Sequence, residues 1–322
     1  MAQDIFKGLG VSLVTPFIQR DTIRRHRIGQ KIDIEYPEKI YMPGFYGQLD
    51  RLIEQKPDFF VVCDVAGEAT TLNYDEHIKM IDAVVQRAQK RIPVLAATGA
   101  NSTIEAIELS RKAKYAGANG VLVVVPYYIR PPEAGIVMHF RHIRKELGKK
   151  FPIILYDNPG RTGISLSAKT ILMLAHEGTI QGVKLASGEV QQVRDIVNAR
   201  PQNFTILVGD DRLIYPLMHE SADGAVSVAA NIVFNEMRQL VDFASQKAYE
   251  KALECHLRLN QLFEELETET NPIPIKTALA LIYPKDFFKV FRSPLCPLSE
   301  VELGIIKEER LAQVLNSLHL IG

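Results

Sequence analysis

The sequence holds a lysine, a tyrosine and an arginine at positions where together they could form and use an imine. Lys184 ends an apolar run, so partial desolvation would disfavour its ammonium form and lower its pKa towards that of a usable amine nucleophile. Such an amine forms Schiff bases with ketones. Tyr156 ends the preceding apolar run and could carry the protons that imine formation requires. Arg161, a few residues later, offers a planar fork for a substrate carboxylate.

Each of these residues also has a purely structural interpretation. Lys184 could pair with Asp210 or Glu68 in a structural ion pair, and Arg161 could form a salt bridge at the rim. A buried tyrosine such as Tyr156 is often a core residue with a satisfied hydroxyl. Position in the sequence alone leaves both interpretations open.

The secondary structure predicted around these residues repeats along the chain. Short β-branched apolar runs are bounded by turn residues and followed by stretches with helical spacing of apolar residues. The predicted strands are 11–15, 59–63, 94–98, 121–125, 153–156, 180–184, 205–209 and 225–228; the predicted helices are 45–54, 75–89, 103–116, 132–147, 167–176, 189–199 and 212–220, with an eighth beginning near residue 235. Strands as apolar as GVLVVV need cover on both faces, so the pattern predicts an α/β fold, a (β/α)8 TIM barrel. The rival, an open doubly wound sheet, lacks its phosphate fingerprint, because GLGVSL at 8–13 precedes a strand.

The division predicted along the chain is a barrel at 1–245 and a C-terminal helical extension at 246–322. Within the extension, NPIPIK at 271–276 is interpreted as a proline-rich break, and a final helix is expected near 300–315. An arm at 18–43 is inserted into the barrel. Its Arg-rich run and the alternating KIDIEY predict a hairpin turning at Gly29, as a solvated or subunit-bridging arm.

Composition limits the partners. The 322 residues carry 38 basic and 38 acidic side chains, so no overall field recruits nucleic acid or an anionic membrane. The three cysteines are too few for a disulfide framework and lack metal-ligand spacing, and no signal peptide or membrane span is recognised. We therefore expect a cytoplasmic protein that binds small molecules and other protein chains, with no metal and no organic cofactor.

Several segments together carry a family resemblance. YDNPGRTG at 156–163, followed by VKLASG at 183–188, resembles the Schiff-base lyase family of dihydrodipicolinate synthase and N-acetylneuraminate lyase, the synthase branch being nearest. Further segments agree in order: GVSLVTPF at 10–17, GEATTLNYDEH at 67–77, GAN at 99–101, PYYIRPP at 126–132, GDD at 209–211 and NPIPIK at 271–276. The resemblance covers nearly the whole chain except the arm.

The resemblance implies a role for each matched residue. Lys184 would form the Schiff base with pyruvate, Tyr156 would relay protons, and Arg161 would face a carboxylate. Tyr128 matches a tyrosine that family members insert into a neighbouring subunit's site, which implies a homotetramer built as a dimer of dimers. The remaining substrate-binding positions implied are Val65, Ala66 and Val226.

One motif departs from the family. Where members carry Gly-Thr-Thr-Gly-Glu after the second strand, this chain reads DVAGE at 64–68, so the hydroxyls expected at Val65 and Ala66 are both absent. Backbone N–H groups there can still hold a carboxylate, because that contact needs no side chain. The proton relay through the first hydroxyl is missing.

The leading reaction implied is condensation of pyruvate with L-aspartate semialdehyde, the entry step of lysine and diaminopimelate biosynthesis. The alternatives are an aldolase or dehydratase acting on a 2-keto-3-deoxy sugar acid and a catalytically impaired, ligand-binding member of the family. A feedback site for free lysine is also implied, although Ala69 and Tyr74 depart from its usual residues. The positions that match it are His77, Asn101, Glu105 and Tyr127.

Overall fold

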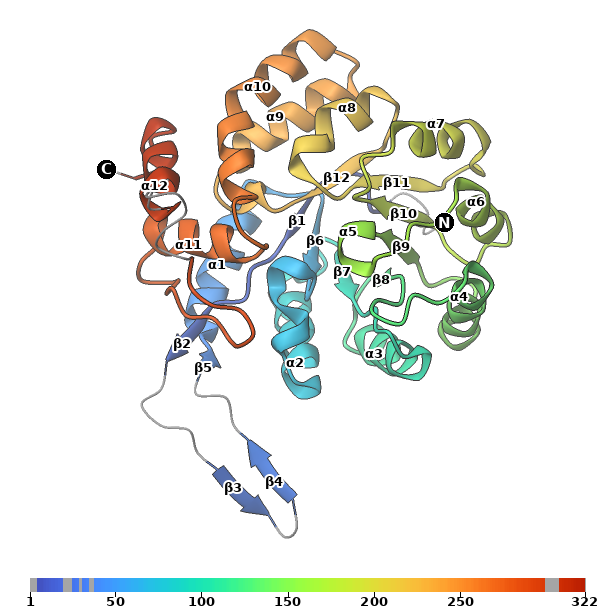
Figure 1. Cartoon of the computed structure of the whole chain (residues 1–322), viewed down its shortest axis with the longest axis horizontal. Coiled ribbons are helices and arrows are strands. Elements are labelled where there is room, and N and C mark those ends of the chain that lie inside the picture. The colour runs from blue at the N-terminus through green and yellow to red at the C-terminus, as the bar shows by residue number, and fades with distance from the viewer. Residues whose placement is uncertain (1–4, 20–24, 29–30, 35–37, 299–306, 322) are drawn as a thin grey trace.

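The computed structural model describes residues 5–19, 25–28, 31–34, 38–298 and 307–321. Parallel strands close into a barrel in the order β1-β12-β11-β10-β9-β8-β7-β6, and helices surround it (Figure 1). The barrel strands are β1 (Gly8–Ser12), β6 (Phe59–Val62), β7 (Val94–Ala97), β8 (Gly120–Val124), β9 (Ile153–Asp157), β10 (Gly182–Leu185), β11 (Thr205–Val208) and β12 (Gly224–Ser227). The predicted (β/α)8 barrel is confirmed.

The helices between the strands also agree with the sequence pattern to within a few residues. They are α1 (Met42–Gln55), α2 (Tyr74–Ala88), α3 (Thr103–Tyr115), α4 (Glu133–Leu147), α6 (Ala168–His176), α7 (Val190–Ala199), α8 (Ile214–His219) and α9 (Phe234–Ser245). A short helix that the sequence did not predict, α5 (Pro159–Thr162), follows β9. It carries Arg161, so the arginine lies on an ordered turn instead of a loop.

The first strand was predicted at 11–15, whereas β1 begins at Gly8 and includes two glycines. A Cβ atom on Gly10 would lie 2.2 Å from a carbon of the Phe59 ring, so only glycine fits there. Alternation along β1 then turns Val11 towards the surrounding helices, among the larger apolar cluster. Ser12, on the opposite face, points into the barrel.

The barrel interior is filled by its own apolar cluster. Its buried members are Phe6, Phe59, Val61, Leu95, Leu122, Ile154, Tyr156, Leu207 and Val226. A second and larger cluster fills the layer between strands and helices. The interior is therefore a packed core, and the active site is expected at the carboxyl ends of the barrel strands.

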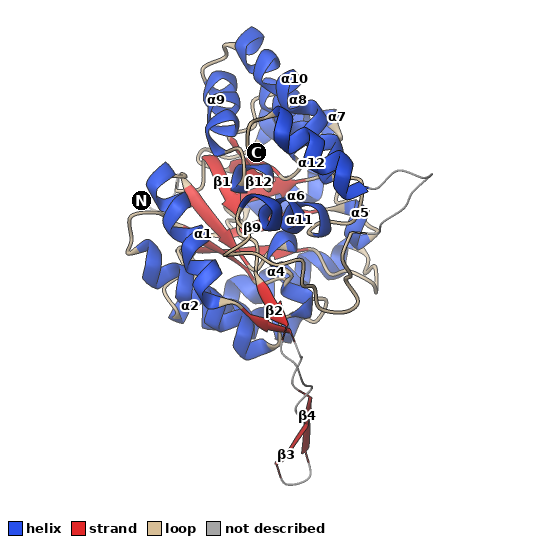
Figure 2. Ribbon diagram, turned by 90° about the vertical axis from the view of Figure 1, so that its left-hand side faces the viewer, coloured by secondary structure: helices blue, strands red, loops and turns tan. Residues whose placement is uncertain are grey.

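The arm is a pair of two-stranded segments. β2 (Phe17–Gln19) pairs with β5 (Glu38–Ile40), and β3 (Arg25–Ile28) pairs antiparallel with β4 (Lys31–Ile34), as the predicted hairpin requires. Residue Gly29, the predicted turn, lies outside the described residues. Figures 1 and 2 both show β3 and β4 projecting away from the barrel.

The base of the arm is anchored by the C-terminal extension. Arg292 is fully buried, donates to the backbone oxygen of Glu38, and forms a two-pronged ion pair with Glu76 on α2 at 2.6 and 2.7 Å. Charge-assisted pairs of this geometry fix orientation as well as adding stability. The extension therefore holds the arm's base against the barrel.

The extension contains α10 (Tyr249–Leu266), α11 (Ile273–Ile282) and α12 (Lys307–Ser317). The predicted break at NPIPIK is wrong in part. The break between α10 and α11 spans 267–272 and includes only the first two residues of the motif. The helix α11 begins at Ile273, with a proline in its first turn, where a missing N–H costs nothing. Residues 300–306 of the predicted final helix lie outside the described residues. The predicted division at 245/246 falls between α9 and α10 and stays a prediction. Within the described ranges, no helix is both long and apolar enough to cross a membrane.

Candidate active site

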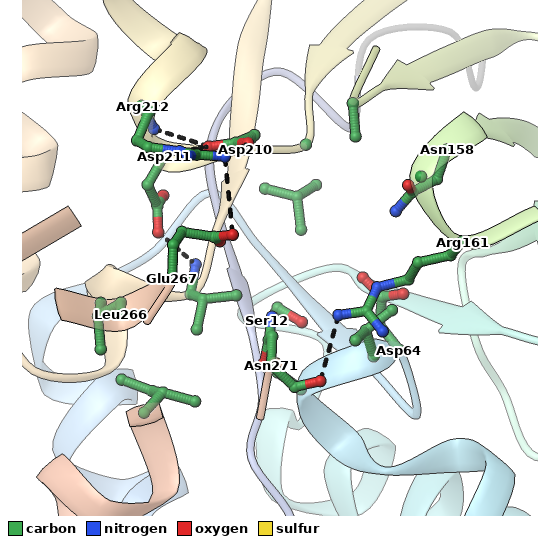
Figure 3. Close-up of a pocket in the computed structure, with 18 of the residues that line it drawn as sticks. Ser12, Asp64, Asn158, Arg161, Asp210, Asp211, Arg212, Leu266, Glu267 and Asn271 are labelled. Atoms are coloured by element: carbon green, nitrogen blue, oxygen red, sulfur yellow. Dashed lines mark hydrogen bonds and ion pairs between the residues drawn. The ribbon is translucent and has the colours of Figure 1, made fainter. Parts of the chain in front are cut away.

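A cavity of about 420 Å³ opens at the carboxyl ends of the barrel strands (Figure 3). Lys184 on β10 lies directly beside Tyr156 on β9, since the two residues are register partners. Gly209 follows the neighbouring strand β11, and a Cβ atom there would lie 2.7 Å from Cε of Lys184. The glycine thus leaves room for the lysine side chain, and the predicted meeting of Lys184 and Tyr156 is observed.

Lys184 forms a buried ion pair with Asp64, which the sequence did not predict. Its Nζ lies 2.6 Å from Oδ2 of Asp64, and the two side chains are 3% and 6% exposed. Burial by itself lowers the pKa of Lys184, but the attraction of the Asp64 carboxylate, with Tyr156, outweighs burial and raises that pKa above its ordinary value. The expectation of a lowered pKa is wrong, because it considered desolvation without the counter-charge.

The partners that the sequence offered for Lys184 are engaged elsewhere. Glu68 pairs with Lys276 of α11 at 2.5 Å, and Asp210 pairs with Arg212 at 2.8 Å. The proposed ion pair of Lys184 with Asp210 or Glu68 is therefore wrong. Asp64 comes closer because it lies two residues beyond the end of β6, at the N-cap position of a one-turn helix at the mouth of the barrel.

Tyr156 combines the two roles considered for it. Its ring belongs to the core of the barrel interior, and Nζ of Lys184 lies 4.0 Å from the ring centroid. Its hydroxyl accepts a hydrogen bond of 2.7 Å from Nδ2 of Asn158. Burial raises the pKa of Tyr156, so the phenol is held neutral. A neutral phenol beside the amine is suited to donate protons, and its relay role stays a prediction.

The two walls of the cavity differ in charge: one carries an arginine without a carboxylate partner, and the other carries an arginine paired with two carboxylates. Arg161 is exposed, donates to the backbone oxygen of Asn271 at 3.2 Å, and has no carboxylate within salt-bridge distance among the described residues. Arg212, across the cavity, contacts Asp210 at 2.8 Å and Glu267 at 3.6 Å (Figure 3). Burial raises the pKa of Glu267. No sequence pattern links Glu267 to the barrel, so it was not among the predicted site residues. Among the described residues, the rim salt bridge considered for Arg161 is not formed. Its guanidinium charge is therefore available to a substrate carboxylate.

The neighbouring carboxylate Asp211 has a structural task. Its Oδ2 accepts the backbone N–H groups of Val228 at 3.1 Å and Ala229 at 2.8 Å, which fixes the loop after β12. Burial raises its pKa to about 6. These hydrogen bonds therefore fix the part of the cavity wall that contains Val226 and Val228.

The predicted substrate-binding residues Val65, Ala66 and Val226 all line the cavity. Their binding role stays a prediction. Ser12 lines it as well, although it was not among the predicted site residues. Its hydroxyl is buried and has no hydrogen-bond partner within the described structure. Unpaired buried hydroxyls are costly, so Ser12 is suited to meet a polar ligand.

Tyr128 does not reach the cavity of its own chain. It follows β8 with a φ of 72° and is 87% exposed. The subunit contact implied for it stays a prediction.

A second cavity of about 560 Å³ adjoins the first and is lined by His77, Glu105 and Tyr127. Asn101 does not line it; burial raises the pKa of Tyr127, and the nearby backbone of Asn101 opposes that rise. The ring of His77 is buried and bonded through Nε2 to the backbone oxygen of Ala97 at 2.8 Å, so it serves the fold. The structure thus brings three of the four predicted regulatory residues to one cavity.

Comparisons with known proteins agree with this geometry. Residues 46–309 match the Dihydrodipicolinate synthetase family. A 4-hydroxy-tetrahydrodipicolinate synthase of Pelobacter propionicus is 38% identical over 321 residues, covering 98% of this chain and 100% of that protein. The crystal structure of the chloride-inhibited dihydrodipicolinate synthase of Acinetobacter baumannii, complexed with pyruvate, matches with a TM-score of 0.87 and 34% identity over 98% of this chain and 99% of its own. A monomeric dihydrodipicolinate synthase variant matches with the same TM-score and 29% identity, covering 100% and 99% of the two chains. The chain belongs to the dihydrodipicolinate synthetase family.

Proposed function

We propose that this chain is a class I lyase that condenses pyruvate with an aldehyde, with L-aspartate semialdehyde as the leading candidate. The observation that carries the proposal is the buried Lys184 at the carboxyl end of β10, with Tyr156 and Arg161 in the same cavity. Relatives named 4-hydroxy-tetrahydrodipicolinate synthase along the full length support the choice of aldehyde.

Each residue has a task in the proposed reaction. The amine of Lys184 attacks C2 of pyruvate, and loss of water gives an iminium ion. Removal of a methyl proton then gives an enamine, whose carbon attacks the aldehyde. Tyr156 exchanges protons with these intermediates, and Arg161 orients the aldehyde through its carboxylate.

The charge distribution supports this aldehyde over a sugar. L-Aspartate semialdehyde carries a carboxylate and an ammonium group at its far end. Arg161 on one wall matches the carboxylate (Figure 3). On the other wall, Asp210 and Glu267 share the single cation Arg212, so the three side chains together present a net negative charge to the ammonium group. A polyhydroxylated aldehyde has no cation for the acidic wall.

The test is consumption of pyruvate by the purified protein with L-aspartate semialdehyde or with D-glyceraldehyde. We expect consumption with L-aspartate semialdehyde alone. Consumption with D-glyceraldehyde only would replace the proposal with the 2-keto-3-deoxy sugar acid reaction. Imine formation with no turnover of either aldehyde would identify a ligand-binding family member.

Arg161→Ala is expected to lower kcat/KM for L-aspartate semialdehyde by about 10- to 100-fold, because a hydrogen bond to a charged group contributes about 1.5–3 kcal/mol. The rate of imine formation with pyruvate should stay unchanged, which separates aldehyde binding from the first chemical step. Steady-state kinetics with both substrates varied would check this. An unchanged kcat/KM would remove Arg161 from aldehyde binding.

We further propose that free lysine binds in the second cavity, with the Glu105 carboxylate as the partner of its ammonium group. Glu105→Ala should then abolish the heat of binding that calorimetry measures with millimolar lysine. Glu108→Ala, on the same helix, serves as the control. The absence of heat with the unaltered protein would rule out the site.

A homotetramer acting in the cytoplasm is part of the same proposal. The exposed Tyr128 supports it, since a large aromatic side chain in solvent gains by burial against another subunit. Sedimentation of the purified chain would determine its oligomeric state: a tetramer is expected, and a monomer would contradict this part of the proposal.

A further inference from the structure

Asp64 is the side chain in closest polar contact with the reacting amine, and the proposed mechanism gives it no task. Oδ2 of Asp64 lies 2.6 Å from Nζ of Lys184, although the residues are 120 positions apart. Both side chains line the cavity and both are almost fully buried. A buried carboxylate retained at this position requires a reason, because burying an ion pair brings little or no net stability.

The amine cannot react in the form that this contact favours. An ammonium ion has no lone pair, so Lys184 must lose a proton before it attacks a carbonyl carbon. The neighbouring Val65, Ala66 and Val226 bring no side-chain group that could take that proton. Tyr156 is a neutral phenol whose hydroxyl is bonded to Asn158. Asp64 is the group in contact with Nζ that can accept a proton.

Resting on the proposed function, we propose that Asp64 is the catalytic proton shuttle of imine formation, while Tyr156 exchanges protons in the steps that follow the iminium ion. Its carboxylate takes a proton from the Lys184 ammonium, and the free amine forms the C–N bond to C2 of pyruvate. The shuttle returns that proton to the former carbonyl oxygen, giving a carbinolamine. A second proton follows the same route from nitrogen to oxygen, the C–O bond breaks, and water leaves. The three protons of the ammonium end as one on the iminium nitrogen and two on the water, so Asp64 finishes as a carboxylate.

A second observation supports an oxygen intermediate in this place. The hydroxyl of Ser12 is 1% exposed, lines the same cavity, and has no partner within the described residues. A carbinolamine hydroxyl or the pyruvate carboxylate would give it one. The barrel end thus offers an acid–base group and an unused hydroxyl in one cavity with the amine.

The first test replaces the carboxylate by an amide of the same shape. Asp64→Asn can still accept a hydrogen bond from Lys184 but cannot accept its proton. The rate at which pyruvate becomes trapped by cyanoborohydride should fall about 10²- to 10⁴-fold, the usual contribution of general acid–base catalysis. Asp50→Asn, which removes a surface carboxylate paired with Arg87, should leave that rate unchanged. Thermal unfolding of both variants checks that the fold persists.

The second test restores the missing group from solution. Asp64→Ala leaves space for a small acid, so added formate should raise its trapping rate in proportion to formate concentration. Formate should not accelerate the unaltered protein. Exchange of the pyruvate methyl protons with deuterated water, followed by NMR, should show the same loss and the same rescue without any aldehyde.

The outcomes separate this proposal from the function on which it rests. If the unaltered protein traps no pyruvate, the Schiff-base function itself fails. If it traps pyruvate but Asp64→Asn reacts as fast or faster, Asp64 is a counter-ion that restrains the amine and the shuttle is overturned. If Asp64→Ala gains nothing from formate while remaining folded, the shuttle is equally overturned.

Discussion

Lys184→Arg is expected to abolish both the pyruvate imine and turnover while leaving the fold intact. The guanidinium cannot be deprotonated in a protein, so it forms no Schiff base, and loss of a covalent nucleophile costs on the order of 10⁶-fold. It can still pair with Asp64, which avoids an unpaired buried carboxylate. Turnover with L-aspartate semialdehyde and mass spectrometry after reduction with pyruvate measure the two losses.

Lys149→Arg is the matched control, because this exposed lysine follows α4 outside the cavity. It should retain turnover and the trapped adduct. Residual turnover of Lys184→Arg above a few per cent of the unaltered protein would contradict covalent catalysis by this lysine.

Lys276→Met is expected to lower the free energy of unfolding by about 3–5 kcal/mol, the usual cost of breaking a buried ion pair. Lys276 and Glu68 have no exposed side-chain surface and lie 2.5 Å apart, and the lysine also lies 4.0 Å from the ring centroid of Phe17. Removal of the lysine leaves the Glu68 carboxylate buried without its cation. Urea denaturation at one fixed protein concentration measures the change.

The double variant Lys276→Met with Glu68→Gln should recover part of this loss, because it removes both charges together. Lys285→Met, at an exposed position after α11, is the control and should change stability by less than about 0.5 kcal/mol. Equal losses in Lys276→Met and the double variant would show that the pair does not determine the cost.

The sequence was sufficient for the parts of the molecule that follow from local pattern. Apolar runs and helical spacing predicted the strands and helices of the barrel, and the ends of those runs identified Lys184 and Tyr156. Both signals arise within one element and its neighbours. For that reason the barrel and the meeting of these two residues are confirmed, although β1 begins earlier because Gly10 packs on Phe59.

Contacts between distant parts of the chain could not be predicted in this way. Asp64 and Lys184 are 120 positions apart, and Glu68 and Lys276 are 208 apart. Which carboxylate reaches which lysine depends on the loop after β6 and on where α11 packs. The pKa of Lys184 was predicted to be lowered and is raised for the same reason. Its position at the end of an apolar strand predicts desolvation, but it does not predict the nearby carboxylate of Asp64. Ser12 was missed because its type is unremarkable until its position inside the barrel is known.

Covalent catalysis by Lys184 is tested most directly by reduction of the unaltered protein with borohydride in the presence of pyruvate, followed by peptide mass spectrometry. We expect one adduct, with the mass of reduced pyruvate, on the peptide that contains Lys184, and none when pyruvate is omitted. An unmodified Lys184, or an adduct on another lysine, would show that Lys184 does not form the Schiff base.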